Sequence, residues 1–394
     1  MRQSPTRTVD LRAAPHPSTG LPDLDVALGG LLWGDNVVWF VDGGSAEPFF
    51  RAIVAAEAGF DVVTWVAVER DPDEIRTAVP EARVLDARPG SELAAPAALL
   101  QAIRRQLVGA RRELLLFDGL EAMADRWGPD VAARFFAACC PRLLALGAIA
   151  YWSLDVGRGR SGIAEVVTRV TQCIIRVDAR TVTVEKAEGR PDTVRGHRLA
   201  WTVEDGAARL SPAPIAALLA ASLRTLRQTR GLSQTDLARL AGVTPSAVSQ
   251  AERGDRGLSL ETLLRLADAL HMSLDDLLRA QRRTPYHVGR RDDDPDVLRS
   301  GSQPLLDPAG TRPGVALGRL PPRGAGAPEP GQHGQAVITV GSGLVQVLVD
   351  DATPSLRQGD ALTCEASRVT GWRNLGDGDA LLFWTVVPPA AERE

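Results

Sequence analysis

Lysine is almost missing from this chain, and cysteine is rare. Lys186 is the only lysine among 394 residues, and we attribute the excess of arginine over lysine mainly to coding composition. The four cysteines form no C-x-x-C pair and show no zinc-finger spacing: Cys139, Cys140, Cys173 and Cys364. This pattern argues against a structural zinc site, and a reduced interior is the simplest setting for these thiols.

Long apolar runs are also missing. The first 17 residues contain arginines and prolines but no apolar signal core, and the longest apolar run, Leu143 to Leu154, is too short to span a bilayer. We therefore expect residues 1–17 to be a disordered tail. We also expect a cytoplasmic, nucleoid-associated protein with no membrane partner.

The composition is otherwise that of a globular protein, with 44% hydrophobic and 24% charged residues. The length allows two or three domains. A net charge of −4 argues against a surface that binds nucleic acid everywhere. Basic residues are instead concentrated between Leu218 and Arg283, where ten arginines face seven acids. A local excess of this kind is what a DNA-binding segment needs.

Residues 218–278 have the apolar spacing of five short helices. Leu219, Leu223 and Leu226 recur at helical intervals, and similar spacing continues through Leu270. Ser233 with Asp236, and Ser273 with Asp276, have the spacing of capping boxes. The segment therefore predicts a compact all-α domain.

The second and third of these helices are joined by a tight turn. Gly242 is expected to end the second helix, and Thr244 to cap the third. Pro245 then occupies the first turn of the third helix, and Gly254 follows its end. Two helices joined in this way predict a helix-turn-helix.

The stretch "LRTLRQTRGLSQTDLARLAGVTPSAVSQAERGDRGLSLETLLRLADAL" resembles the XRE-type, phage-repressor-like family of helix-turn-helix domains. The resemblance implies that the third helix enters the major groove of double-stranded DNA. The implied base-contacting residues are Thr244, Pro245, Ser246, Ser249 and Gln250. The implied phosphate contacts are Gln234, Arg227, Arg253 and Arg256. The alternatives are that these side chains are merely solvated, or that the bundle binds another protein.

The N-terminal half alternates short β-rich runs with alanine-rich helical stretches. Runs at Asn36–Val41, Val62–Val68, Leu114–Phe117 and Ala148–Ser153 predict a mainly parallel sheet covered by helices. Between Gln172 and Leu210 the pattern changes to successive strands. This change predicts an antiparallel extension of the same sheet.

The segments "TGLPDLDVALGGLLWGDNVVWFVDGG" and "LLLFDGL" resemble a RecA-like ATPase of the KaiC type, over Ser18 to Pro212. The phosphate-binding loop, however, lacks its chemistry. Pro48 stands at the second motif glycine, Phe49 at the lysine and Phe50 at the Ser/Thr position, and Glu47 adds a negative charge. Hydrolysis is therefore not expected.

Three remnants of the nucleotide site are recognisable through the same resemblance. Asp118 matches the Walker B carboxylate and Glu69 the first catalytic glutamate, with Arg70 in place of the second. Lys186 matches the lysine that reaches a neighbouring subunit's nucleotide, but Glu188 replaces the arginine two residues later. We expect no bound cofactor, no catalytic residue and a pseudo-ATPase retained for self-association or partner docking.

The C-terminal part is rich in short strands and turns. Strands are expected at Val315–Arg319, Ala336–Val340, Leu344–Val349, Asp360–Cys364 and Leu381–Val387, which together predict a small all-β barrel. The stretch from Gly341 to Pro389 resembles a cupin domain through Gly343, Gly359, Asp360, Trp372 and Asn374.

The cupin metal ligands are missing from this resemblance. Pro330, Gln332, Ala336 and Thr370 stand at the ligand positions, and His333 is out of register, so no metal is expected. The barrel could still pair subunits, or bind a small molecule in its mouth.

The expected organisation is multi-domain: an α/β RecA-like domain at 18–212, an all-α helix-turn-helix domain at 216–281, a linker at 282–302 and an all-β cupin barrel at 303–390. The predicted function is a sequence-specific, non-enzymatic transcriptional regulator, acting as a homodimer or higher homo-oligomer. A nucleotide-responsive scaffold and, less favoured, a cupin-type enzyme are the alternatives.

Overall fold

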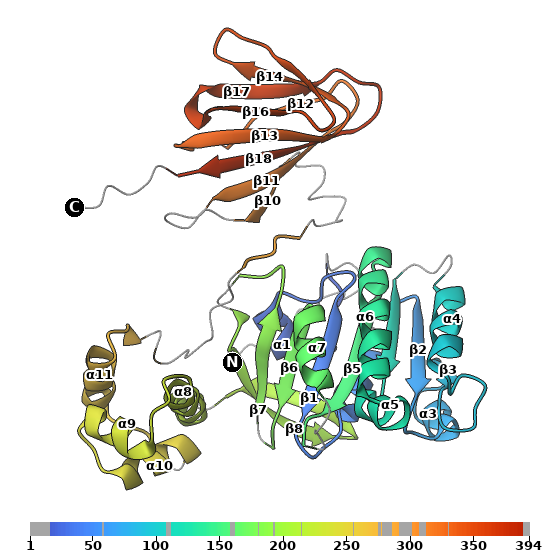
Figure 1. The fold of residues 1–394 in the computed structure, drawn as a ribbon, viewed down its shortest axis with the longest axis vertical. Coiled ribbons are helices and arrows are strands. Elements are labelled where there is room, and N and C mark those ends of the chain that lie inside the picture. The colour runs from blue at the N-terminus through green and yellow to red at the C-terminus, as the bar shows by residue number, and fades with distance from the viewer. Residues whose placement is uncertain are drawn as a thin grey trace, which may run out of the picture. The chain divides into compact units, whose positions relative to one another are not determined.

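A computed structural model gives the fold (Figure 1). It describes residues 16–56, 59–107, 112–157, 162–179, 181–191, 194–213, 215–254, 256–274, 277, 286–290, 302–306, 313–329 and 331–388, and for 215–218 and 221 the backbone alone. The chain divides into two compact units, Met1–Arg283 and Thr284–Glu394, and each is described by itself. Among the described residues, no helix is both long and apolar enough to cross a membrane.

A nine-stranded sheet forms the α/β part, in the order β3-β2-β4-β5-β1-β6-β7-β8-β9. The first six positions in this order pair in parallel, and β7, β8 and β9 add antiparallel strands. The strands are β1 Asn36–Val41, β2 Val62–Ala67, β3 Arg83–Asp86, β4 Glu113–Phe117, β5 Ile149–Asp155, β6 Cys173–Val177, β7 Thr181–Ala187, β8 Arg198–Glu204 and β9 Ala207–Pro212.

Helices cover both faces of this sheet because its central strands are apolar on both sides. In β1, Trp39 packs into one core and Phe40 into the other. One face carries α1 Pro22–Leu28, α2 Glu47–Ala55 and α3 Pro72–Ala78. The other carries α4 Pro96–Gln106, α5 Leu120–Trp127, α6 Pro129–Leu146 and α7 Ile163–Val170.

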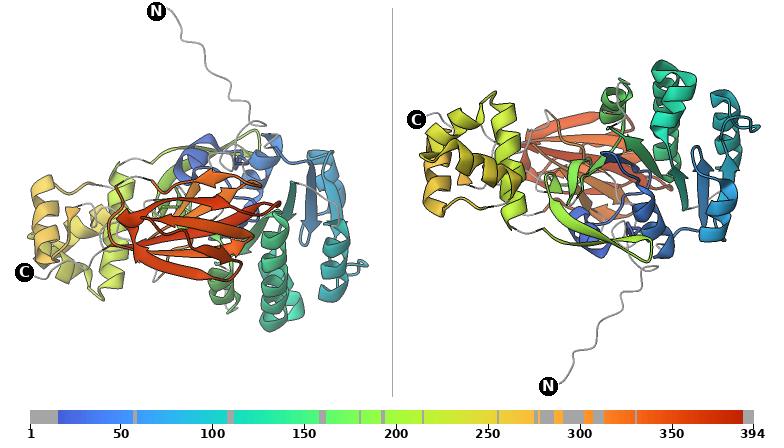
Figure 2. Two further views of the ribbon diagram at one scale, coloured as in Figure 1. Left: turned by 90° about the horizontal axis from the view of Figure 1, so that it is seen from above. Right: turned by 90° about the horizontal axis from the view of Figure 1, so that it is seen from below.

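A bundle of short helices follows, seen from two sides in Figure 2. Its members are α8 Ile215–Thr229, α9 Gln234–Ala241, α10 Pro245–Arg253 and α11 Leu260–Ala269. Their leucines and alanines form one core, with Leu223, Leu237, Val248 and Leu266 almost fully buried. Leu274 and Leu277 are also helical, but Asp275, Asp276 and residues 278–285 lie outside the described residues, so the expected fifth helix and its Asp276 cap are not tested.

The C-terminal unit is built from two antiparallel sheets around a shared core that includes Trp372 and Trp384. The five-stranded sheet has the order β10-β11-β18-β13-β16, and the four-stranded sheet β12-β17-β14-β15. The strands are β10 Ser302–Leu306, β11 Gly314–Leu320, β12 Ala325–Gly326, β13 Gln335–Ser342, β14 Leu344–Val349, β15 Ser355–Arg357, β16 Ala361–Glu365, β17 Val369–Asn374 and β18 Ala380–Val387.

The three predicted fold classes are confirmed: α/β, all-α and all-β. Four strands of the barrel and β3 are additional to those expected. Residue Ser302, placed in the linker from the sequence, already belongs to β10.

Candidate nucleic-acid interface

Local capping fixes the ends of α9 and α10. The Ser233 hydroxyl accepts a hydrogen bond from the Asp236 amide, and the Asp236 carboxylate accepts one from the Ser233 amide, which forms the expected capping box. The hydrogen bonds from Ser233 also hold the pKa of Asp236 below its ordinary value. Gly242 ends α9 in the left-handed conformation (φ 67°), a conformation that costs a glycine little. The tight turn of the predicted helix-turn-helix is thus explained by its sequence.

Helix α10 begins as expected. Thr244 is extended and its hydroxyl accepts a hydrogen bond from the Ala247 amide at 3.2 Å, while Pro245 occupies the first turn. Gly254 closes the helix in the left-handed conformation. The cap satisfies an amide that would otherwise point out of the helix end without a partner.

One face of α10 packs into the bundle and the opposite face carries the predicted base-contacting residues. Val248, Ala251 and Glu252 are buried. Thr244, Pro245 and Ser246 are exposed, and Ser249 and Gln250 are half-buried. The structure therefore gathers these five residues on the first two turns of one helix. Their contact with bases remains a prediction.

Arginines extend this polar face beyond the helix. The Arg253 guanidinium donates to the Ser249 hydroxyl at 2.7 Å, one turn earlier on the same helix. Arg253 and Arg256 are both exposed. Long exposed cations beside the end of α10 fit the predicted role of phosphate contacts.

Glu252 is the polar centre of the bundle. Only 3% exposed, its carboxylate accepts hydrogen bonds from Arg227 of α8 at 2.6 and 3.2 Å and from the Gln234 amide of α9 at 2.9 Å. Arg224 of α8 donates to the Glu252 backbone carbonyl at 2.7 Å. Burial alone would raise the pKa of Glu252, but the hydrogen bonds from Arg227 and Gln234 outweigh it and leave the pKa below its ordinary value. Three helices are thus tied together at the last turn of α10.

Two of the predicted phosphate contacts lie at this carboxylate. Arg227 forms a two-point pair with Glu252, a geometry that the planar guanidinium favours, and its contact with phosphate remains a prediction. Gln234 also gives its amide nitrogen to Glu252, and its predicted phosphate contact remains untested. The sequence reasoning missed the role of Glu252. One signal for this role was available in the sequence: Glu252 is an acid at a position of α10 that the helical spacing expects to be buried, so it needs a partner inside the bundle.

Residues 43–50, compared above with a phosphate-binding loop, lead into the first turn of α2, where two aromatic side chains enter the core. Phe49 and Phe50 are at most 1% exposed. Phe49 stacks on Trp39 with ring centroids 4.5 Å apart, and Phe50 packs against Trp65 and Tyr151 at 5.7 and 5.8 Å. The side chains at the lysine and Ser/Thr positions therefore point into the sheet and away from a nucleotide.

A small polar cavity of about 170 Å³ remains beside this loop, lined in part by Glu47, Glu69, Arg70 and Asp118. Pockets for drug-sized ligands begin at about 300 Å³, so this one is small for a nucleotide. Arg70 pairs with Glu47, and Glu47 also accepts from Arg51 at 2.7 Å. The acid that replaces a loop residue is thus neutralised within the chain.

Asp118 and Glu69 lie together at the carboxyl ends of β4 and β2. Asp118 accepts hydrogen bonds from the amides of Val68 and Glu69 at 2.7 and 3.1 Å and from the Trp65 indole at 3.2 Å. Burial dominates and raises the pKa of Asp118. Its carboxylate oxygens thus receive hydrogen bonds from the protein itself, while Glu69 is exposed.

Lys186, the third remnant, is turned inward. It is 7% exposed, and its ammonium group lies 3.0 Å from the Glu188 carboxylate and donates to the Thr168 carbonyl at 3.0 Å. The acid at position 188 thus binds the lysine that the resemblance would direct towards a neighbour.

The cupin ligand positions are scattered in the C-terminal unit. Gln332 accepts a hydrogen bond from the Trp384 indole, Ala336 is buried in the core and Thr370 is exposed. Pro330 lies outside the described residues. Across the described part of the chain, no three His, Cys, Asp or Glu side chains are grouped so as to hold a metal ion.

Comparison with known proteins identifies the helical bundle. A helix-turn-helix family model, HTH_3, matches residues 223–277. Control protein C.SmaI of Serratia marcescens is 38% identical over 64 residues, which are 16% of this chain and 76% of that protein.

Solved structures resemble parts of the chain. An HTH_3 family transcriptional regulator from Vibrio cholerae is 24% identical, covering 44% of this chain and 97% of its own, with a TM-score of 0.21. A KaiC-like protein from Pyrococcus horikoshii is 14% identical over 50% of this chain and 99% of its own, with a TM-score of 0.42. The Cupin_2 domain of an XRE family transcriptional regulator from Enterobacter cloacae is 16% identical over 22% and 95%, with a TM-score of 0.21.

Proposed function

The chain belongs, through residues 223–277, to the XRE-type (HTH_3) family of helix-turn-helix DNA-binding transcriptional regulators, and from this we propose that it recognises a specific operator sequence as an oligomer. The observation that supports recognition of a DNA sequence is that Thr244, Ser246 and Gln250 lie at the start and on the first two turns of α10, on its outward face. A hydroxyl can bond several bases, and a glutamine amide can bond adenine at two points.

The outward face has the chemical make-up of a base reader. It combines small hydroxyls, an amide and an apolar proline ring that fits a thymine methyl. None of its five residues, Thr244, Pro245, Ser246, Ser249 and Gln250, carries a carboxylate. Arg253 and Arg256 add positive charge where the DNA backbone would pass. An ordinary solvent-exposed helix face would not require this combination of hydroxyl, amide and apolar groups.

Selection of bound sequences from a random DNA pool tests this proposal. We expect one preferred motif, repeated as two half-sites about 10 base pairs apart, because a single recognition helix covers few base pairs. The matched control is the Gln250→Ala protein on the same pool, whose motif should lose information at one position in each half-site. A pool without enrichment would contradict the proposal.

We also propose that the α/β part is not catalytic and serves assembly or partner docking. The inward Phe49 and Phe50, the Glu47–Arg70 pair and the Lys186–Glu188 pair support this reading. Phosphoryl transfer depends on positive charge around the phosphates, and the two described cations Arg70 and Lys186 each have an acid beside them. Magnesium-dependent ATP hydrolysis by the purified protein, lost on Glu69→Ala, would contradict it.

A nucleotide-responsive scaffold is the second candidate, favoured only by the fold of the α/β part. It requires that ATP change the oligomeric state, which sedimentation with and without ATP measures directly. We expect the same oligomer in both conditions. The C-terminal barrel is proposed to pair subunits and to take a small molecule in a cavity described next.

A further inference from the structure

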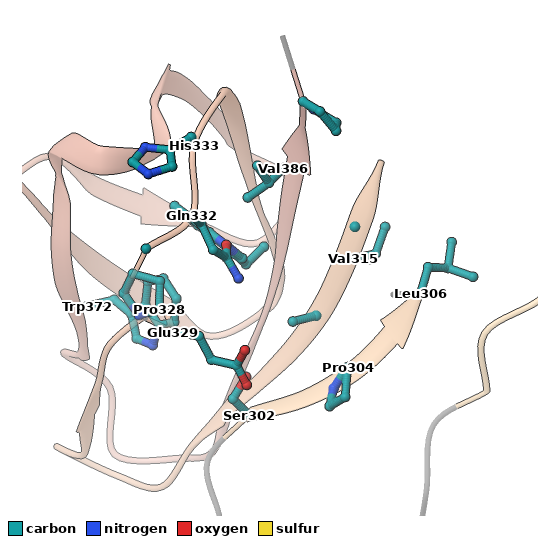
Figure 3. Close-up of a pocket in the computed structure, with 15 residues that line it drawn as sticks. Ser302, Pro304, Leu306, Val315, Pro328, Glu329, Gln332, His333, Trp372 and Val386 are labelled. Carbon is teal, nitrogen blue, oxygen red and sulfur yellow. The ribbon is translucent and has the colours of Figure 1, made fainter. Parts of the chain in front are cut away.

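The C-terminal unit contains a cavity of about 340 Å³. This volume lies within the range of pockets that bind small molecules. Its lining comes from strands β10, β11, β17 and β18 and from the loop before β13 (Figure 3). All its lining residues belong to the C-terminal unit.

Two indole rings form a corner of this cavity. Trp372 and Trp384 are 2% and 3% exposed, and their ring centroids lie 5.5 Å apart with an interplanar angle of 49°. The Trp384 indole N–H donates to the Gln332 side-chain oxygen, so its hydrogen bond is already made and the ring is held in place. Both indoles line the cavity, and an indole is the aromatic side chain that attracts an organic cation most strongly.

The charge of the lining has one clear sign. Glu329 is the carboxylate of the cavity, His333 lies at its edge, and none of the described lining residues is a lysine or an arginine. Among the lining residues that the structure describes, an anionic ligand would therefore meet a carboxylate and no fixed positive charge. A cation would meet a carboxylate and two indoles.

The opposite wall is apolar. Figure 3 shows Trp372 on one side of the cavity and Pro304, Leu306 and Val315 on the other. Ser302, on the same strand as Pro304, is the one hydroxyl among the described lining residues. A ligand that fits both walls has a charged end and an apolar body. A fully hydrated inorganic cation would leave the apolar wall without a partner.

From this arrangement we propose that the cavity binds a small organic ammonium ion with an apolar body, held between Glu329 and the two indoles. This proposal names the class of small molecule that the C-terminal barrel would bind, and it rests on the proposed function of that barrel. It does not depend on which DNA sequence is read.

Calorimetric titration of the full-length protein tests the proposal with three probes of nearly the same shape. They are choline, its uncharged carbon analogue 3,3-dimethylbutan-1-ol, and the anion 3,3-dimethylbutyrate. We expect choline to bind at least about tenfold more tightly than the neutral analogue, and the anion to bind more weakly than either, because the Glu329 carboxylate and the two indoles all favour a cation.

Substitutions at two lining positions, with one control outside the cavity, locate the binding. Glu329 is exposed, so Glu329→Gln removes its charge without disturbing the core, and we expect the preference for choline over the alcohol to fall several-fold, with the indoles keeping the rest. Glu365→Gln, an exposed acid that does not line the cavity, is the matched control and should change nothing. Trp372→Phe keeps an aromatic face and should retain more of the preference than Trp372→Leu.

Equal affinity for choline and the alcohol, tighter binding of the anion, or an unchanged preference in Glu329→Gln would each overturn the proposal. If Trp372→Leu does not fold, the Glu329→Gln comparison decides alone. Operator binding measured on the same samples separates the two levels. If the wild-type protein binds its operator but does not bind choline preferentially, only the proposed ligand class is wrong. If the wild-type protein shows no specific DNA binding, the proposed function itself is wrong.

Discussion

Arg227 and Glu252 join the first and third helices of the DNA-binding bundle through two hydrogen bonds, Nε to Oε1 at 2.6 Å and Nη2 to Oε2 at 3.2 Å. The carboxylate end is 3% exposed and the guanidinium end 20%. Because Gln234 donates to the same carboxylate, the orientation of α10 relative to α8 and α9 depends on one buried acid.

Removing this acid should destabilise the bundle strongly. Glu252→Ala leaves the Arg227 guanidinium partly buried and without its carboxylate partner. We therefore expect the free energy of opening α10 to fall by about 3 kcal/mol. This is the lower end of the range for breaking a buried ion pair, because Arg227 is partly exposed. Hydrogen exchange of the α10 amides measures it. Glu261→Ala, which breaks an exposed pair with Arg265, is the control and should stay within about 0.5 kcal/mol.

The same acid predicts a dependence of stability on pH. The folded pKa of Glu252 lies below its ordinary value of 4.5, so the pair stabilises the bundle at pH above that value and its contribution is lost as the pH falls through the folded pKa. In hydrogen exchange or thermal melting, the difference between wild type and Glu252→Gln should be constant from pH 8 to about pH 5 and should shrink below it. A difference that grew on acidification would contradict the assignment.

Arg256 should act on DNA binding through charge alone. Arg256→Gln removes one exposed cation beside the end of α10, so we expect weaker binding to all DNA sequences and a salt dependence, log K against log salt, that is shallower by about 1. Fluorescence anisotropy at several salt concentrations measures both. Arg265→Gln, an exposed arginine of α11, is the control. An effect confined to one operator sequence would instead make Arg256 a base contact.

Phe49 should behave as a core residue of the α/β part. It is fully buried and stacked on Trp39, so Phe49→Ala should cost about 3–5 kcal/mol of stability. Thermal or urea unfolding followed by tryptophan fluorescence measures it. Leu146→Ala, at a position 59% exposed, should change stability by less than about 0.5 kcal/mol. A small cost for Phe49→Ala would mean that the first turn of α2 is not packed as described.

Local signals made much of the DNA-binding bundle predictable. Ser233, Gly242, Thr244 and Gly254 determine helix ends through contacts with residues at most four positions away, so their roles can be read from the sequence. The strands β1 and β14 were placed at their observed bounds because continuous or alternating apolar residues end at turn residues.

Contacts between residues far apart in the chain could not be predicted from such local patterns. Glu252 meets Arg227 and Gln234 across 25 and 18 residues, and no local pattern links them. Strand β17 was missed because Gly371, Arg373 and Asn374 interrupt its apolar alternation, and β3 because four residues give too little pattern. The hydrogen bond from Lys186 to the Thr168 carbonyl of α7 joins residues 18 positions apart, and no local pattern predicts it.

The central claim is that α10 reads a DNA sequence. The most direct test is binding of the full-length protein to its selected operator, compared with a scrambled duplex, for wild type, Ser246→Ala and Gln250→Ala, with melting temperature checked in parallel. We expect each substitution to lower the preference for the operator by about 1–3 kcal/mol, with stability and binding to the scrambled duplex unchanged. An unchanged preference in both variants would contradict it.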